Sequence, residues 1–167
     1  TRALVAETTN QAYDLILALR PSALDDLGLD PALRAHAERA LKDTGIQLQI
    51  DSRHLTRRLP PEMEVALFRA FQEALTNIVR HAQARRVSIS LAAPDGSFEG
   101  EIADDGRGFD LREARSNGDG PRGLGLLGMQ ERVAQCGGRL QIFTAPHTGT
   151  RIRIHIPIPE VTNGCEN

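Results

Sequence analysis

Apolar residues recur every three or four positions in several stretches of the chain, a spacing that predicts helices. The first stretch covers residues 1–20 and ends at Pro21, because proline lacks the N–H that the helical hydrogen-bond ladder requires. A second helix is expected to open at Asp30, a good cap followed by a proline in the first turn, and to end at about Asp43. We expect residues 22–30 between the two helices to be a connector.

The strongest helical pattern spans residues 61–82 and opens with two prolines and a glutamate. One side of it is expected to face the core; this side carries Val65, Phe68, Ala74, Leu75, Ile78 and Val79. A further helix is expected over residues 124–136, where two glycines stop it. Just before that helix, residues 110–122 are polar, charged and without a clear period, which indicates a mobile loop.

Alternating apolar and polar positions predict five strands. They fall at residues 46–50, 86–91, 98–103, 140–143 and 151–158. Turns at residues 94–96 and 146–149 join two pairs of these strands into hairpins. Hairpins with separate helices, rather than regular strand-helix alternation, indicate an α+β fold in which helices cover one face of a mixed, mainly antiparallel sheet.

The composition is that of one globular domain with room for a small appendage: 167 residues, of which 40% are hydrophobic and 25% charged. A net charge of −2 with both signs interspersed gives no broad attraction to nucleic acid, so any phosphate chemistry is expected to be local. No apolar run approaches the roughly 20 residues that cross a bilayer. Two distant cysteines, Cys136 and Cys165, indicate a reduced, cytoplasmic protein and not a disulfide framework.

Three polar residues, Glu73, Asn77 and His81, are spaced four apart in the strongest predicted helix. Four residues turn a helix by one revolution and about 40° more, so the three side chains form one polar stripe that can address one ligand. Amide and carboxylate oxygens suit Mg²⁺, which keeps several waters and is usually shared with substrate phosphates. Arg80 adds positive charge beside the stripe. The same spacing also fits a solvated face of an otherwise buried helix.

The segment Asp104-Asp105-Gly106-Arg107-Gly108 follows a predicted strand. Its glycines let the backbone turn sharply and approach a ligand, and a carboxylate at a strand end can accept a hydrogen bond from an exocyclic amine such as that of adenine. The segment is neither a P-loop nor the glycine-rich loop of a dinucleotide-binding fold. Taken singly, it also fits an Asp-Gly turn at the end of a strand.

Two more glycine-containing segments follow along the chain. Residues 123–128, Gly-Leu-Gly-Leu-Leu-Gly, are expected to open a helix, where free backbone N–H groups and the helix dipole favour phosphate. Thr150, after Gly149, begins the last predicted strand and would place a hydroxyl near the site if that strand returns beside Asp104. Their plainer interpretations are a glycine hinge and ordinary turn chemistry.

In this order, the four segments closely resemble the ATP-binding domain of the gyrase, heat-shock chaperone, histidine kinase and mismatch-repair superfamily. Within it, the chain resembles the bacterial two-component sensor histidine kinases of the nitrate-sensor subclass, over residues 12–157. Three phrases carry the resemblance: Leu19-Arg-Pro-Ser-Ala-Leu-Asp-Asp-Leu-Gly28-Leu, Gln72-Glu-Ala-Leu-Thr-Asn77-Ile-Val-Arg-His81-Ala and Gly123-Leu-Gly-Leu-Leu-Gly-Met-Gln-Glu-Arg132.

The resemblance implies a Bergerat-type fold, which is a two-layer α+β sandwich, preceded here by a helix, and it implies ATP and Mg²⁺ as cofactors. Asn77 would coordinate the Mg²⁺, and Glu73 would orient or activate the attacking group. Arg80 and His81 would lie near the phosphates. The family often has lysine where this chain has Arg80, which keeps the charge but changes its geometry.

On the base side of the implied ATP site, Asp104 would accept from the adenine amine, directly and through water. Gly106 and Gly108 would shape that wall, and Thr150 would support the adenine-side water. The next segment would also line the ATP site, with its glycines at the phosphates; it comprises Gly123, Leu124, Gly125 and Leu126. Residues 110–122 would be the ATP lid.

The resemblance also divides the chain into three parts. Residues 1–21 would be the second helix of the dimerisation and phosphoacceptor hairpin, residues 30–160 the ATP-binding catalytic domain, and residues 161–167 a tail. Sensor kinases carry the acceptor histidine on the first helix of that hairpin, and the five histidines of this chain all come later: His36, His54, His81, His147 and His155. We therefore expect a catalytic domain that transfers the ATP γ-phosphoryl group to a histidine upstream of this chain.

The partners that the resemblance implies are a response regulator with a receiver domain, of the helix-turn-helix DNA-binding type, and a second copy of the full-length protein in a homodimer. No direct nucleic-acid contact is expected. Membrane attachment is expected only through the upstream region, with this part of the chain in the cytoplasm and the full-length protein anchored in the inner membrane.

Two other classes of protein remain open. A stand-alone anti-sigma-factor serine kinase shares this ATP site and has a similar length, but it offers no reason for the leading helix. A degenerate nucleotide-binding interaction module would work by contact alone. Glu73 and Asn77 argue against the module, because a protein that only binds has no need of a base.

Overall fold

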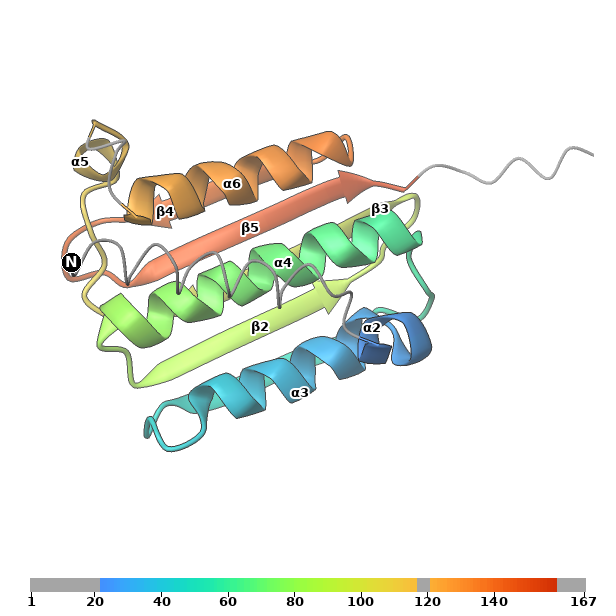
Figure 1. The fold of residues 1–167 in the computed structure, drawn as a ribbon, viewed down its shortest axis with the longest axis horizontal. Coiled ribbons are helices and arrows are strands. Elements are labelled where there is room, and N and C mark those ends of the chain that lie inside the picture. The colour runs from blue at the N-terminus through green and yellow to red at the C-terminus, as the bar shows by residue number, and fades with distance from the viewer. Residues whose placement is uncertain (1–21, 117–120, 159–167) are drawn as a thin grey trace, which may run out of the picture.

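One five-stranded sheet runs through the part of the chain that the structure, a computed structural model, describes: residues 22–116 and 121–158 (Figure 1). The strands lie in the order β1-β2-β3-β5-β4. Their bounds are Gln47–His54 (β1), Arg86–Ala92 (β2), Ser97–Asp104 (β3), Arg139–Thr144 (β4) and Thr150–Pro157 (β5). β1 pairs with β2 in parallel, and the other neighbouring pairs are antiparallel. The expected mixed, mainly antiparallel sheet is confirmed.

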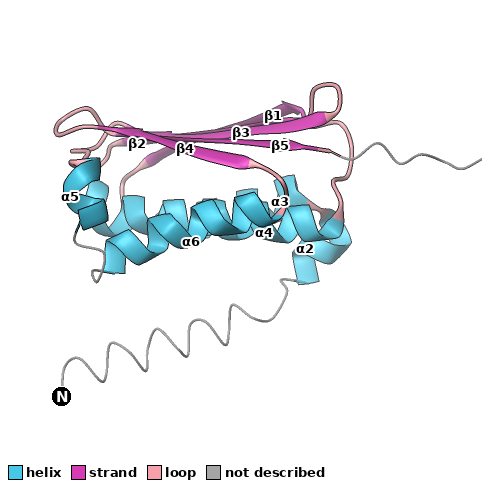
Figure 2. Ribbon diagram, turned by 90° about the horizontal axis from the view of Figure 1, so that it is seen from above, coloured by secondary structure: helices cyan, strands magenta, loops and turns pink. Residues whose placement is uncertain are grey.

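The helices form a second layer on one face of this sheet, as Figure 2 shows from the side. Their bounds are Ser22–Leu27 (α2), Leu29–Leu41 (α3), Pro61–Asn77 (α4), Ile78–Ala82 (the π-helical turn η1), Leu111–Ser116 (α5) and Pro121–Gln135 (α6). The apolar side of α4 packs on the centre of the sheet, where Phe71 and Leu75 are fully buried. The two-layer α+β fold expected from the sequence is therefore confirmed.

The strand register sorts the side chains of the helix-covered face into rows that cross the sheet. One row consists of Ile89, Ile102, Ile152 and Ile142, and the adjoining row consists of Leu91, Gly100, Ile154 and Leu140. Their apolar side chains belong to the core or pack against it. The row nearest the β4–β5 turn is different: Val87 pairs with Asp104, Asp104 with Thr150 and Thr150 with Thr144, so three of its four residues are polar. A single polar row thus borders an apolar sheet face.

The segment expected to be a connector, residues 22–30, is helical, so that expectation was wrong. α2 ends where Gly28 adopts a φ of 88°, and the Gly28 N–H donates to the carbonyl of Leu24 at 3.1 Å. Leu24 and Leu29 are buried in the core. Packing of these two leucines stabilises a helix whose six residues would be marginal alone. The expectations for residues 1–20 and 161–167 lie outside the described residues.

An ion pair between a half-exposed arginine and a buried glutamate fixes α2 to the start of α4. Glu64 is only 3% exposed, and its two carboxylate oxygens accept from Nε and Nη2 of Arg58 at 3.0 and 2.9 Å. The same guanidinium donates to the carbonyl oxygens of Leu24 and Asp25, both at 3.3 Å. Arg58 therefore joins the end of α2, the chain before α4 and α4 itself.

Other boundaries also differ from the sequence expectations. The polar stretch 110–122 is not a loop throughout, because α5 occupies residues 111–116 and α6 begins at Pro121, earlier than the expected start at residue 124. Asp110 caps α5: its Oδ1 accepts from the backbone N–H groups of Arg112 and Glu113 at 2.7 and 3.3 Å. β1 extends to His54, beyond the predicted end at residue 50, and α3 ends at Leu41.

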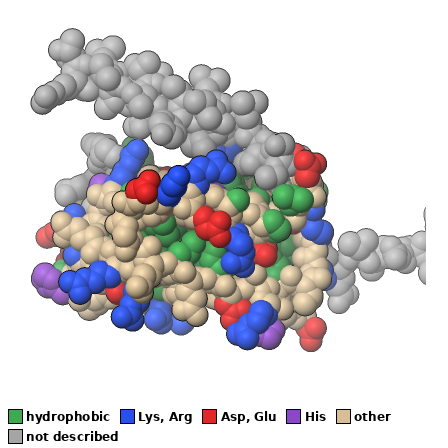
Figure 3. Space-filling model, turned by 90° about the horizontal axis from the view of Figure 1, so that it is seen from below, with side chains coloured by type: hydrophobic (Ala, Val, Ile, Leu, Met, Phe, Trp, Pro, Cys, Tyr) green, Lys and Arg blue, Asp and Glu red, His purple; other side chains and the backbone are tan. Residues whose placement is uncertain are grey.

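Charged side chains of both signs are interspersed on the face that Figure 3 presents, with no large area of one sign. This agrees with the balanced composition. Among the described residues, no helix is long and apolar enough to cross a membrane.

Candidate functional site

A pocket lies between the end of α4 and the polar row of the sheet. Asn77 and His81 line its helix side, and Asp104 and Thr150 line its sheet side. The remaining lining residues are mostly apolar: Ala74, Ile78, Ala82, Ile102, Gly108, Phe109, Leu126 and Ile152. Segments that lie far apart in the sequence thus meet around one apolar hollow with a few polar groups, which is typical of small-molecule sites.

Asp104 is the acidic group of this pocket. Its Oδ1 accepts from the backbone N–H of Gly106 at 2.8 Å. Burial raises the pKa of the Asp104 carboxyl above its ordinary value, and hydrogen bonds from Gly106 and Thr150 act in the opposite direction. The side chain can therefore accept a hydrogen bond from a ligand in partly desolvated surroundings, where such a bond is strong.

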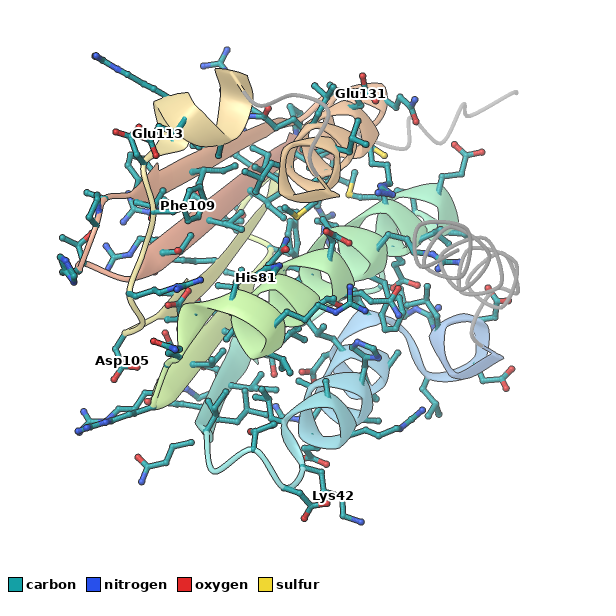
Figure 4. The ribbon with its side chains drawn as sticks, turned by 60° about the vertical axis from the view of Figure 1, so that its left-hand side comes forward. Lys42, His81, Asp105, Phe109, Glu113 and Glu131 are labelled. Carbon is teal, nitrogen blue, oxygen red and sulfur yellow. The ribbon has the colours of Figure 1, made fainter. Side chains whose placement is uncertain are left out.

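Asp105, the neighbouring carboxylate, has a different role. Its Oδ1 accepts from the backbone N–H groups of Arg85 and Arg86 at 2.7 and 2.8 Å, and these two bonds lower the pKa of Asp105. It is exposed and lies apart from His81 (Figure 4). Asp105 thus holds the start of β2, and only Asp104 faces the pocket.

The loop after Asp104 is tied to the end of the π-turn. Arg107 donates from its backbone N–H to the carbonyl of Ala82 at 2.8 Å, and from Nε to the carbonyl of His81 at 2.7 Å. Gly106 is buried against Ala82, and Gly108 has a φ of 57°. A Cβ on Gly108 would overlap the carbonyl oxygen of Ala145. Only glycine fits at these two close approaches.

The polar stripe of α4 faces the first turns of α6. Asn77 donates from Nδ2 to Oε1 of Glu73 at 3.2 Å, an orientation that leaves the amide oxygen as the available metal ligand. A Cβ on Gly125 of α6 would overlap that same Glu73 oxygen. One amide and one carboxylate fit Mg²⁺, because this ion completes its shell with water and phosphate. No group of three or more His, Cys, Asp or Glu side chains that could hold a metal occurs in the described residues.

His81 and Arg80 lie at the end of this stripe but differ in position. His81 lines the pocket, whereas Arg80 is exposed and does not. Both residues belong to η1, whose wider turn interrupts the regular spacing on which the stripe was predicted. The π-turn brings His81 and Ala82 against the loop that Arg107 anchors.

The predicted residues of α6 are also divided between two environments. Leu126 is 6% exposed and lines the pocket, while Leu124 is 59% exposed and does not. Gly125 lies against Glu73, next to the pocket. The backbone of Gly123 lies within the first turn of α6.

The apolar lining of the pocket was not predicted from the sequence, and Phe109 is the clearest case. It follows the glycine segment directly, and its side chain lines the pocket together with His81; both residues are labelled in Figure 4. Ile102 and Ile152 could have been found, since they precede Asp104 and follow Thr150 by two positions in strands of alternating pattern. Thr144 was also missed, because its place beside Thr150 depends on the strand register.

The chain is similar in sequence to known proteins. Residues 62–160 match the family described as histidine kinase-, DNA gyrase B- and HSP90-like ATPase. The signal transduction histidine-protein kinase/phosphatase DegS of Brevibacillus brevis is 39% identical over 94% of this chain and 39% of that protein. The oxygen sensor histidine kinase NreB of Staphylococcus carnosus is 33% identical over 94% of this chain and 44% of that protein.

A solved structure shares the fold. The histidine kinase domain of the blue-light activated histidine kinase from Erythrobacter litoralis EL346 superposes with a TM-score of 0.64 and 23% identity, covering 78% of this chain and 59% of that one. The present chain spans less than half the length of the two curated relatives above.

Proposed function

The chain belongs to the histidine kinase-, DNA gyrase B- and HSP90-like ATPase family, and we propose that it is the ATP-binding catalytic domain of a two-component sensor histidine kinase. It would transfer the γ-phosphoryl group of ATP to a histidine on a separate helical segment, for relay to a response regulator. The relatives named above, two histidine kinases, support this assignment.

The observation that carries the proposal is that polar side chains stand on two opposite sides of one apolar pocket. Asp104 and Thr150 lie on the sheet side, and Asn77 lies on the helix side, hydrogen-bonded to Glu73. A purine base could lie on the apolar lining with its amine toward Asp104, while its phosphates extend toward α4 and α6. A site for a mononucleotide needs such a division between a base end and a phosphate end.

At the base end, we assign Asp104 as the acceptor for the adenine amine and Thr150 as its hydroxyl neighbour. Gly106 and Gly108 let the loop approach closely enough to form this wall. At the phosphate end, Gly123 lies in the first turn of α6, where backbone N–H groups have no helical partner and suit phosphate oxygens, and Gly125 follows beside Glu73. Residues 110–122 would act as the lid. Arg80 would contribute charge from the rim, because it is exposed.

In the transfer step, Asn77 would hold Mg²⁺, which would neutralise charge on the phosphates. Glu73 would accept the proton from the acceptor imidazole as its nitrogen attacks the γ-phosphorus. The bond between that phosphorus and the bridging oxygen of ADP breaks as the phosphorus–nitrogen bond forms. The hydrogen bond from Asn77 to Glu73 would keep the base oriented for this role.

The histidines of this chain are poorly placed to be the acceptor. His36 packs edge-on against Phe68 at 5.5 Å between ring centres, and burial lowers its pKa. His81 belongs to the nucleotide pocket itself, so it would neighbour the ligand rather than receive the phosphoryl group. The other three, His54, His147 and His155, are exposed at positions that do not line the pocket.

Two measurements test the proposal. Calorimetric titration of the chain with Mg²⁺-ATP should show binding. Incubation with labelled ATP should leave the chain itself without acid-labile phosphohistidine, and label should appear on a dimerising polypeptide that carries the acceptor helix, supplied as a separate partner or fused upstream. Acid-stable label on a serine would indicate the anti-sigma-factor class, and binding without transfer to any acceptor helix would indicate a degenerate module. Phosphohistidine mapped to one of the chain's own five histidines would contradict the assignment.

A further inference from the structure

Thr144, on the strand β4, is the third member of the polar row and is hydrogen-bonded to three separate parts of the site. Its hydroxyl donates to the carbonyl of Gly149 at 3.0 Å and accepts from the backbone N–H of Phe109 at 3.2 Å. It also lies 3.3 Å from the hydroxyl of Thr150. One half-buried side chain thus joins the pocket loop, the β4–β5 turn and the hydroxyl of Thr150.

The direction of the bond between the two threonines follows from a count of hydrogens. A hydroxyl has one hydrogen to donate and two lone pairs to accept with. The hydrogen of Thr144 is directed to Gly149, whose carbonyl is both the nearer and the stronger acceptor. The two lone pairs of Thr144 then remain for Phe109 and for Thr150, so Thr150 is the donor when this pair is bonded.

Thr150 itself lies between two acceptors. In the strand register it faces Asp104 on one side and Thr144 on the other. Hydrogen bonding from Thr150 to Asp104 contributes to lowering the pKa of that carboxyl. Since Thr150 has one hydroxyl hydrogen, it can satisfy Asp104 or Thr144 at one time, but not both.

We propose that Thr144 is a positioning residue for purine recognition: it accepts the hydroxyl hydrogen of Thr150 when the amine of a bound base takes the place of that hydrogen on Asp104. This inference rests on the proposed function, because it requires an aminopurine nucleotide in the pocket. Without Thr144, a Thr150 hydroxyl displaced from Asp104 by the ligand would have no acceptor within the polar row, at the cost of a half-buried unpaired donor. With Thr144 present, Asp104 accepts from the amine of the base while the hydroxyl hydrogen of Thr150 is bonded to Thr144.

The test compares two nucleotides that differ only in the recognised group. ATP carries the 6-amino group, and purine riboside triphosphate lacks it. Affinities of both, with Mg²⁺, are measured by calorimetry for the wild-type chain and for Thr144→Val, which keeps the shape and removes the hydroxyl. Thr144→Ser restores the hydroxyl. Thr148→Val is the matched control, because among the described residues the hydroxyl of Thr148 bonds within its own turn, to the backbone of Ala145.

We expect Thr144→Val to bind ATP about threefold to tenfold more weakly than the wild type, the effect of one lost hydrogen bond. Its affinity for purine riboside triphosphate should change little, so the ratio of the affinity for ATP to the affinity for purine riboside triphosphate should fall. Thr144→Ser should recover that preference, and Thr148→Val should retain it. If Thr144→Val does not fold, as judged by thermal unfolding, Thr144→Cys serves in its place, since a thiol is a poor acceptor.

Equal weakening of both nucleotides in Thr144→Val would show that Thr144 only supports the loop and the turn, and would overturn the inference. Failure of Thr144→Ser to recover the preference for ATP would overturn it as well. A wild-type chain that binds neither nucleotide would instead contradict the proposed function, so the two failures are distinguishable.

Discussion

Gly125 of α6 lies so close to Glu73 of α4 that a side chain at this position would overlap the carboxylate oxygen that Asn77 holds. The absence of a Cβ therefore leaves room for the Glu73 carboxylate at the proposed phosphate end of the pocket. Gly128, one turn later, is less crowded, because the atom nearest to an added Cβ, at the end of the flexible Arg132 side chain, would lie 3.0 Å away.

Gly125→Ala should weaken Mg²⁺-ATP binding and slow phosphoryl transfer, because either α6 or Glu73 must move. Gly128→Ala is the control. Alanine is favoured over glycine in a helix interior by roughly 0.5 to 1 kcal/mol at both positions, so a difference between the variants reports the overlap with Glu73. Thermal unfolding measures the stability of each variant, and calorimetric titration measures its affinity for Mg²⁺-ATP. Equal behaviour of the variants would mean that α6 does not depend on this close approach.

Asp104→Asn should lower the affinity for Mg²⁺-ATP by about tenfold or more, because a hydrogen bond to a charged acceptor contributes roughly 1.5 to 3 kcal/mol. Asp105→Asn is the matched control: it makes the same chemical change one residue away, at a carboxylate that bonds to β2 and does not line the pocket. Its affinity should be that of the wild type. Unchanged affinity in Asp104→Asn would remove this residue from the base end.

The same Asp104→Asn substitution should make the nucleotide-free chain more stable at neutral pH. Burial raises the pKa of Asp104, so the folded chain favours the protonated carboxyl and loses stability as that group ionises. The wild type should therefore lose stability relative to the variant as the pH rises from the ordinary carboxyl range through the raised pKa. Below the ordinary range the difference should vanish, since both chains then carry a neutral side chain.

Urea denaturation of both chains across this pH range checks the effect on stability. A constant difference at every pH would contradict a raised pKa at Asp104. ATP affinity should follow the opposite course, falling as the pH drops through the raised pKa, because the ionised carboxylate is the better acceptor for the base amine.

Glu73 and Asn77 should separate in their effects. Asn77→Ala should reduce Mg²⁺-dependent nucleotide binding, whereas Glu73→Gln should leave binding nearly intact and slow phosphoryl transfer about 100-fold or more, the range of general-base catalysis. Glu62→Gln is the control, since Glu62 is exposed in the first turn of the same helix. Calorimetry and single-turnover transfer to a supplied acceptor helix measure the two properties. Parallel loss of binding in both variants would refute the division of roles.

Arg58→Met should destabilise the chain by roughly 1 to 3 kcal/mol, because the buried carboxylate of Glu64 loses the half-exposed guanidinium that pairs with it and retains the backbone N–H of Leu59. The double variant Arg58→Met/Glu64→Leu should recover part of this loss, since the unpaired charge is then gone. Arg53→Met removes an arginine of similar ion-pair geometry, but that pair with Asp51 is exposed, so little change is expected. Chemical denaturation measures the free energy of unfolding of each variant. Equal losses in Arg58→Met and Arg53→Met would contradict the prediction.

The sequence alone could predict most of this architecture because most of it follows local periodicity. The alternation through Ile152, Ile154 and Ile156 identifies a strand whichever strands lie beside it. α2 could not be found in this way: a six-residue helix has too few positions to show a period, and its stability comes from the packing of Leu24 and the bonds from Arg58, which lies 34 positions later.

Some residues of the site could likewise be placed from local patterns, and others could not. Alternation from Ile102 places Asp104 on the core side and Asp105 on the other, which the structure confirms. Arg80 could not be placed correctly from an ideal helical period, since the π-turn changes the direction of the residues after Asn77. Thr144 depends on which strand pairs with which and in what register, and a single strand's pattern holds no such information.

Because of the π-turn, the geometry of the site depends on the number of residues between Asn77 and Ala82. Its last two carbonyls, those of His81 and Ala82, are the ones that Arg107 bonds. Deleting one residue between Asn77 and Ala82 would let the helix continue with regular turns, and those carbonyls would rotate away from the loop that ends in Gly108. The site can thus accept changes of side chain around this turn more readily than a change of its length.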